Sequence, residues 1–138
     1  MKTKYLLISI LFIISIAITG CKDEEQMTLE KYMEENPTVK DQVEKTVEGL
    51  SNEDTETSVA FNDNTIVVTA KLSTIYSEKM IKKMEKAFNE MPQDSFEDAL
   101  TQLEESSGIS GIELKLILQN GDGVNVTERS YKKDGNSL

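Results

Sequence analysis

The feature that most constrains this fold is an order of elements that occurs twice, each time around one of the chain's two prolines. Apolar residues spaced three and four apart predict a helix on either side of Pro37, and again on either side of Pro92. Each helix pair is followed by two alternating apolar and polar stretches, with a short turn rich in Asn, Asp or Gly between them. This order predicts an α+β fold of two layers, with a four-stranded, mainly antiparallel sheet and helices on one face. Two helix-helix-strand-strand repeats would have the same order, although the two halves share few identical residues.

Capping and turn residues indicate where the predicted elements begin and end. Polar side chains are expected at helix starts, because they accept hydrogen bonds from free backbone N–H groups. The expected N-caps are Thr28, Asn36, Ser77 and Ser95, the last as the first residue of a capping box that opens the final helix. Gly108 is expected to end that helix. Turns are expected at residues 62–64 and 120–123, where Asn, Asp and Gly tolerate left-handed backbone geometry.

Residues 1–21 have the layout of a bacterial secretory signal, with a cationic start, an apolar run and small residues before a cysteine. The apolar run is shorter than the roughly 20 residues that a transmembrane helix needs. Cleavage between Gly20 and Cys21 would leave the chain's lone cysteine free to carry a diacylglyceryl group, as in lipoproteins, and two acyl chains anchor a protein stably. The protein is therefore expected on the outer face of the cell membrane. The predicted organisation is a signal peptide at 1–20, the lipidated cysteine and a short tether at 21–27, one α+β domain at 28–131 and a flexible tail at 132–138.

Composition argues against several classes of function. The chain has no histidine, and its lone cysteine would carry lipid, so a Cys–His pair, a Ser-His-Asp triad and a histidine metal site are all ruled out. Paired carboxylates occur, but they are expected by chance among 25 acidic residues. The net charge of −10 opposes binding to nucleic acid. We therefore predict no enzymatic activity, no catalytic residue, no metal site and no cofactor.

A lysine stripe is the first candidate binding surface. It is formed by Lys79, Lys82, Lys83 and Lys86, which share one helical face. The stripe could contact anionic lipid headgroups or an anionic wall polymer such as teichoic acid. The alternative is an ordinary solvated helix face.

The second candidate is the face of the sheet that the helices leave open. If the apolar positions of the second and third strands face the helices, the positions between them face outward. The outward residues would be Val67, Thr69, Lys71, Glu113, Lys115 and Ile117, joined by Thr127, Arg129 and Tyr131 from the last strand. The candidate contacts for another envelope protein are Lys71, Lys115, Arg129 and Tyr131. The alternative is a half-exposed antiparallel sheet that binds nothing.

Several stretches resemble a family of small lipoproteins from Gram-positive bacteria that is known only as a domain of unknown function. These stretches are Leu29–Pro37, Ser95–Leu100, Glu104–Ile112 and Asn120–Val124. The resemblance covers nearly all of residues 28–131, and it implies lipidation and a surface location. It brings no activity and no catalytic residue.

These features predict a membrane-anchored surface lipoprotein that acts as a non-enzymatic binding or accessory module of the envelope. The alternative is an inhibitor or immunity protein that blocks a lysin, a protease or a phage at the cell surface. Residues 13–20 are also similar to the hydrophobic peptide pheromones that some bacteria release from lipoprotein signals, although every signal core is hydrophobic.

Overall fold

The computed structural model describes residues 27–133. The predicted signal peptide, Cys21, the tether up to residue 26 and the tail from residue 134 lie outside the described residues. In chain order the elements are α2 (Leu29–Glu35), α3 (Pro37–Glu48), β1 (Thr55–Asn62), β2 (Thr65–Leu72), α4 (Glu78–Asn89), α5 (Gln93–Ser107), β3 (Glu113–Gln119) and β4 (Asn125–Lys132). The helix-helix-strand-strand order therefore occurs twice, as predicted.

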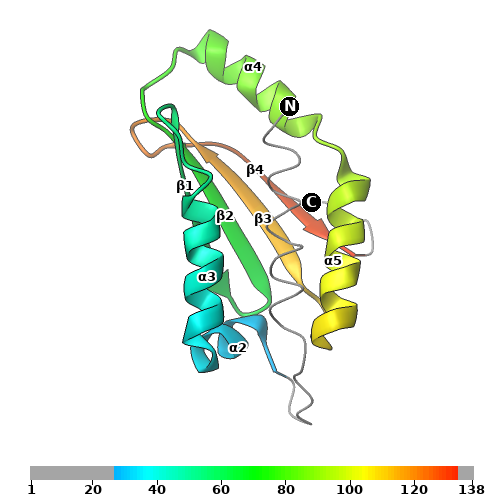
Figure 1. Cartoon of the computed structure of the whole chain (residues 1–138). Helices are drawn as coiled ribbons and strands as arrows, with labels where there is room; N and C mark the ends of the chain where they lie inside the picture. The colour runs from blue at the N-terminus through cyan, green and yellow to red at the C-terminus, as the bar shows by residue number, and fades with distance from the viewer. Residues whose placement is uncertain (1–26, 134–138) are drawn as a thin grey trace.

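The four strands form one sheet in the order β1-β2-β3-β4. β1 and β2 form an antiparallel hairpin, β3 and β4 form another, and β2 pairs with β3 in parallel. A parallel pair needs a long crossover, which α4 and α5 provide here. Figure 1 shows α3 and α5 lying over the same face of the sheet. The prediction of an α+β fold with a mainly antiparallel, four-stranded sheet is confirmed.

Several predicted caps and turns are also confirmed. Thr28 Oγ1 accepts a hydrogen bond from the Lys31 N–H at 3.2 Å. Pro37 is the first residue of α3, a position whose N–H would have no partner within the helix, so proline costs no helical hydrogen bond there. Gly108 ends α5 with a left-handed φ of 71°, and Asp63 adopts a φ of 52° in the β1–β2 turn.

The prediction that a capping box at Ser95 opens the last helix is wrong. α5 begins at Gln93, so Ser95 lies inside its first turn. The reason is Pro92, which occupies the N-cap position with a φ of −65° and a ψ of 123°. Proline lacks the N–H that a continued α4 would need, and its extended ψ lets a new helix start at the next residue. The Gln93 side chain then donates to the Glu97 carboxylate one turn further along α5.

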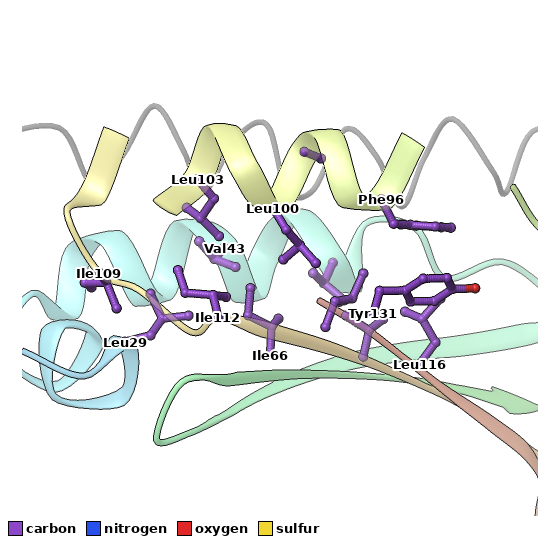
Figure 2. Close-up of a cluster of buried hydrophobic side chains, with 14 of the residues drawn as sticks. Leu29, Val43, Ile66, Phe96, Leu100, Leu103, Ile109, Ile112, Leu116 and Tyr131 are labelled. Carbon is purple, nitrogen blue, oxygen red and sulfur yellow. The ribbon is translucent and has the colours of Figure 1, made fainter. Parts of the chain in front are cut away.

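The hydrophobic core lies between the sheet and the helices. Figure 2 shows Leu100 and Leu103 of α5, Val43 of α3 and Ile66 of β2 as members of one buried cluster. Each of these four side chains is at most 1 % exposed. Full burial of a side chain of this size stabilises a fold by about 1.5–3 kcal/mol. Because α3 and α5 belong to different halves of the chain, this core joins the halves into one unit.

Polar contacts fix the two ends of the sheet. At the end where the chain enters the fold, the Leu29 N–H donates to Asn64 Oδ1 at 2.9 Å, which ties α2 to the β1–β2 turn. At the opposite end, the Tyr76 N–H donates to Asn120 Oδ1 at 2.9 Å, which ties the loop before α4 to the β3–β4 turn. Gly121 allows this contact, because a Cβ there would lie closer than 3 Å to the backbone of the loop. α4 therefore starts at the end of the sheet farthest from the start of α2.

Candidate binding site at the α4 end

The helices leave an apolar cleft of about 190 Å³ open at the end of the sheet where α4 lies. Its floor is made of inward-facing side chains from the two central strands, namely Val68, Ala70, Leu116 and Leu118. Leu50 and Thr57 line it from the side of α3 and β1, and Phe88 and Met91 line it from the side of α4. No acidic, basic or thiol side chain lines the cleft. Its chemistry suits the binding of an apolar group rather than acid–base catalysis.

The cleft is open because α4 does not pack down onto the sheet. α4 separates its apolar and polar residues onto opposite faces more sharply than α3 or α5 does, yet none of its residues is fully buried. Phe88 packs against the core while still partly exposed, and Met80 near the start of the helix is 41 % exposed. At the far end of α4, the Asn89 carbonyl accepts a hydrogen bond from Arg129 Nη1. Polar contacts at its two ends and the partial burial of residues such as Phe88 hold α4 in place.

Exposed apolar side chains gather at the same end of the molecule. Among residues 27–133 the large hydrophobic side chains with high exposure are Ile75, Met80 and Val124. Ile75 is 70 % exposed in the loop before α4, and Val124 is 62 % exposed in the β3–β4 turn that this loop contacts. Exposed apolar side chains that lie in neighbouring segments are candidates for an interaction surface. Sequence reasoning missed this surface, although large apolar residues inside two polar loops were a signal for it.

The lysine stripe lies on the exposed side of α4, as its spacing predicts. Lys79, Lys82 and Lys83 form no ion pair with any of residues 27–133, whereas Lys86 lies 3.8 Å from the Glu90 carboxylate. Most other cations in this part of the chain are paired with acids, such as Lys115 with Glu128 at 3.2 Å. Three of the four lysines of the stripe therefore carry charges that no acidic side chain of residues 27–133 pairs with, on an acidic protein. α4 and the start of α2 lie at opposite ends of the sheet (Figure 1).

The prediction that Arg129 and Tyr131 share the open face of the sheet with Lys71 and Lys115 is wrong. In the observed register Arg129 is opposite Leu116 and Tyr131 is opposite Leu114, so both side chains lie on the helix-covered face. Lys115 and Lys71 lie on the open face. Thr127, opposite Leu118, moves to the covered face for the same reason. The structure therefore separates the four candidate contacts into two pairs on opposite faces.

Tyr131 and Arg129 have structural roles on the covered face. The Tyr131 ring is fully buried, and its centroid lies 4.5 Å from that of Phe96. The Arg129 guanidinium lies over the Tyr131 ring, 5.3 Å from its centroid, in a cation–π contact. Burial raises the pKa of Tyr131, and the charge of Arg129 offsets part of that rise. The hydroxyl oxygen of Tyr131 is buried without a hydrogen-bond partner among the described residues.

The open face of the sheet carries paired charges between half-buried apolar residues. Lys132 lies 3.3 Å from the Glu113 carboxylate across the β3–β4 ladder. Partial burial alone would raise the pKa of Glu113, but hydrogen bonds from Ser130 and Lys132 and the nearby lysine charges lower it overall. Internally satisfied charges of this kind are typical of a solvated face. The open face therefore offers less for a partner than the α4 end does.

Within residues 27–133 no helix is long and apolar enough to cross a membrane. The same part of the chain contains no group of three or more Cys, Asp or Glu side chains placed to hold a metal ion. Neither observation extends to the residues outside that range.

Comparison with known families identifies the chain. Residues 29–131 match the family described as "Domain of unknown function (DUF4854)". The chain belongs to this family. The matched range runs from the first residue of α2 to Tyr131 of β4, so the DUF4854 domain includes the whole sheet except its last residue and all the described helices. No curated protein matches the chain.

One solved structure is similar to the DUF4854 domain. It is a Pseudomonas aeruginosa protein described as a "putative secreted protein", with 12 % sequence identity and a TM-score of 0.47. The similarity covers 78 % of this chain and 96 % of that protein. Neither comparison assigns a ligand or an activity to the α4 end.

Proposed function

We propose that this protein is an exported, membrane-anchored and non-enzymatic binding module of the cell envelope, and that it binds an apolar group of a partner protein at the α4 end. The observation that carries the proposal is the open cleft. Its lining of apolar and uncharged residues offers burial but no general acid, base or activated nucleophile. The exposed Ile75, Met80 and Val124 extend the apolar surface beyond the cleft itself.

The N-terminal sequence supports an anchor at the other end of the domain. Gly20-Cys21 fits a lipoprotein cleavage site, and only residues 22–26 separate the cysteine from the described fold. Fully extended, such a segment reaches about 20 Å. Since α2 starts beside the β1–β2 turn, a lipid on Cys21 would hold that end near the membrane and leave the cleft facing away from it. An outward-facing cleft suits contact with another envelope component.

Site-specific photo-crosslinking in living cells tests the binding proposal. A photoreactive amino acid at Thr55, at the rim of the cleft, should give a discrete crosslinked product. The same amino acid at Thr69, on the open face of the sheet, is the matched control and should give none. Ala70→Phe should fill the floor of the cleft and abolish the Thr55 product, with circular dichroism confirming that the variant folds. Equal crosslinking from Thr55 and Thr69, or a Thr55 product that survives Ala70→Phe, would contradict a partner in the cleft.

The anchor has its own test. Mass spectrometry of the protein from its native membrane should find Cys21 as the N-terminal residue carrying diacylglyceryl, and Cys21→Ser should release the protein into the medium. An unmodified Cys21 inside an uncleaved chain would contradict the anchor and leave the cleft proposal untouched.

A further inference from the structure

The two crossover helices carry stripes of opposite charge. The lysine stripe of α4 is exposed along its whole length. On α5, three exposed acidic residues lie on the side opposite the buried Phe96, Leu100 and Leu103, a fourth, half-buried one lies on the flank, and α5 contains no basic residue. This acidic stripe consists of Asp94, Glu97, Asp98 and Glu105. The first three members repeat the spacing of Lys79, Lys82 and Lys83, because both sets follow the i, i+3, i+4 pattern of one helical face.

Most members of both stripes have no ion pair within the described part of the chain, whereas Lys86 pairs with Glu90 at 3.8 Å. Lys79, Lys82 and Lys83 have no ion-pair partner there, and neither does any residue of the acidic stripe. On the same helix α5, Glu104 points to another side, where it pairs with Lys133 at 3.6 Å. Lysines placed three and four residues apart on one helix face repel one another. An external acidic surface would relieve that repulsion, and an external basic surface would do the same for the acidic stripe.

The positions of the stripes fit a two-fold arrangement. α4 and α5 follow one another along the same side of the molecule, with a bend between them at residues 90–92 (Figure 1). Along the sequence, the midpoint between Lys79 and Lys86 and the midpoint between Asp94 and Glu105 each lie between eight and nine residues from Met91. A two-fold axis near Met91 would therefore place the lysine stripe of one copy beside the acidic stripe of the other, and would do so twice. Contacts of this reciprocal kind are how closed dimers form.

We infer that α4 and α5 form a self-association surface that pairs with a second copy of this chain. The inference rests on the proposed membrane anchor, because exposed ion pairs are individually weak and the two copies each carry a net negative charge. Anchoring both copies in one membrane raises their effective concentration and so favours a contact that is weak in solution.

Energy transfer between anchored copies tests the inference. The chain from Cys21 onward has a single thiol, which can be coupled to a maleimide lipid in neutral phosphatidylcholine vesicles. Donor and acceptor dyes on the C-terminus should then show transfer above the level of a random surface distribution at 50 mM NaCl, falling to that level at 1 M NaCl as the charges are screened.

Charge reversal distinguishes this surface from any other. Lys82→Glu with Lys83→Glu, or Asp94→Lys with Asp98→Lys, should abolish the excess transfer, and a mixture of the two variants should restore it. Lys40→Glu with Lys71→Glu makes the same change in charge on other surfaces and should leave the transfer unchanged. Circular dichroism of every variant checks that it folds.

Three outcomes would overturn the inference. The first is random transfer by the unmodified chain at every salt concentration, and the second is excess transfer that the reversals do not abolish or the mixture does not restore. The third is an effect of Lys82 and Lys83 that appears only on vesicles containing anionic phosphatidylglycerol, which would make lipid headgroups the ligand of the stripe. In this experiment the anchor is attached chemically, so an absence of energy transfer would not bear on lipidation in the cell. Lipidation is tested separately by the mass of the Cys21 peptide.

Discussion

Removing the Tyr131 hydroxyl should stabilise this protein. The side chain is fully buried, and its oxygen has no hydrogen-bond partner among residues 27–133. In the unfolded chain water satisfies that hydroxyl, so folding strips it of hydrogen bonds without replacing them. Tyr131→Phe deletes only the oxygen and keeps the ring that packs on Phe96 at 4.5 Å between centroids.

The size of the effect follows from the cost of an unsatisfied buried hydroxyl. Mutational data place that cost at about 1–3 kcal/mol. The ring loses no apolar contact, but the volume of the oxygen stays empty and a phenylalanine makes a weaker cation–π contact with Arg129, 5.3 Å away. These losses offset part of the gain, so we expect a net increase of about 1 kcal/mol in the free energy of unfolding. For a domain of this size that raises Tm by roughly 4 °C.

Urea unfolding of the chain without residues 1–21 measures the change. Tyr131→Phe should raise the midpoint concentration and leave the slope m unchanged. Tyr76→Phe is the control, because that tyrosine is only half-buried and its change should stay within about 0.5 kcal/mol. A loss of 1 kcal/mol or more in Tyr131→Phe would refute the reasoning, since it would show that the hydroxyl has a partner in the folded protein.

The raised pKa of Tyr131 gives the same substitution a second signature at high pH. The folded state holds the phenol neutral at a pH where the unfolded chain ionises it. This contribution to stability is therefore fully present below about pH 10, the ordinary pKa, and is lost as the pH rises further. Tyr131→Phe should unfold less steeply with pH above 10 than the unmodified protein does.

Three further predictions follow from contacts outside the core. Gly121→Ala should lower the free energy of unfolding by about 1–3 kcal/mol, because its Cβ would meet the backbone of Thr74; an unchanged urea midpoint would mean that the loop and the turn do not touch. Arg129→Met should speed amide exchange along α4 but not in the core of α5, because it frees the Asn89 carbonyl; equal exchange in both proteins would show that α4 is held in another way. The lowered pKa of Glu113 stabilises the fold above its ordinary value of 4.5 and is lost as the pH falls, so Glu113→Gln should flatten the acid side of the stability profile, and parallel profiles for the two proteins would contradict this.

The sequence predicted those parts of the fold in which local chemistry and burial agree. The helix ends were predictable from residue types that favour such positions, as at Thr28, Pro37 and Gly108. The alternation of apolar and polar residues in β2 and β3 was regular enough to assign the buried face of each strand. β4 was different, because its two larger apolar residues, Val126 and Tyr131, are five apart and strict alternation would place them on opposite faces.

A bulge resolves that conflict. Between Leu118 and Gln119 the register shifts by one residue, which leaves Val126 as the extra residue of β4. Because Val126 is outside the regular alternation, its side chain does not fix the face on which Tyr131 lies. Tyr131 faces the core, and Arg129, two residues earlier, lies on the same covered face. No local signal in β4 marks the bulge, because it depends on pairing with β3. For the same reason the cleft could not be predicted, since residues from both halves of the chain line it.

The difference between α2 and α4 explains why an open apolar cleft forms at one end of this fold. The two helices occupy the same place in the repeated order, yet α2 buries Leu29, Tyr32 and Met33 while α4 buries nothing. α2 begins beside the β1–β2 turn and packs directly into the core. α4 instead starts where β2 ends, and α5 alone makes the return path to the start of β3. α4 thus contributes only partly buried side chains such as Phe88 to the core, and nothing in residues 27–133 covers its apolar face fully. The half-buried apolar residues of α4 therefore form one wall of the cleft, where our proposal places an apolar group of a partner.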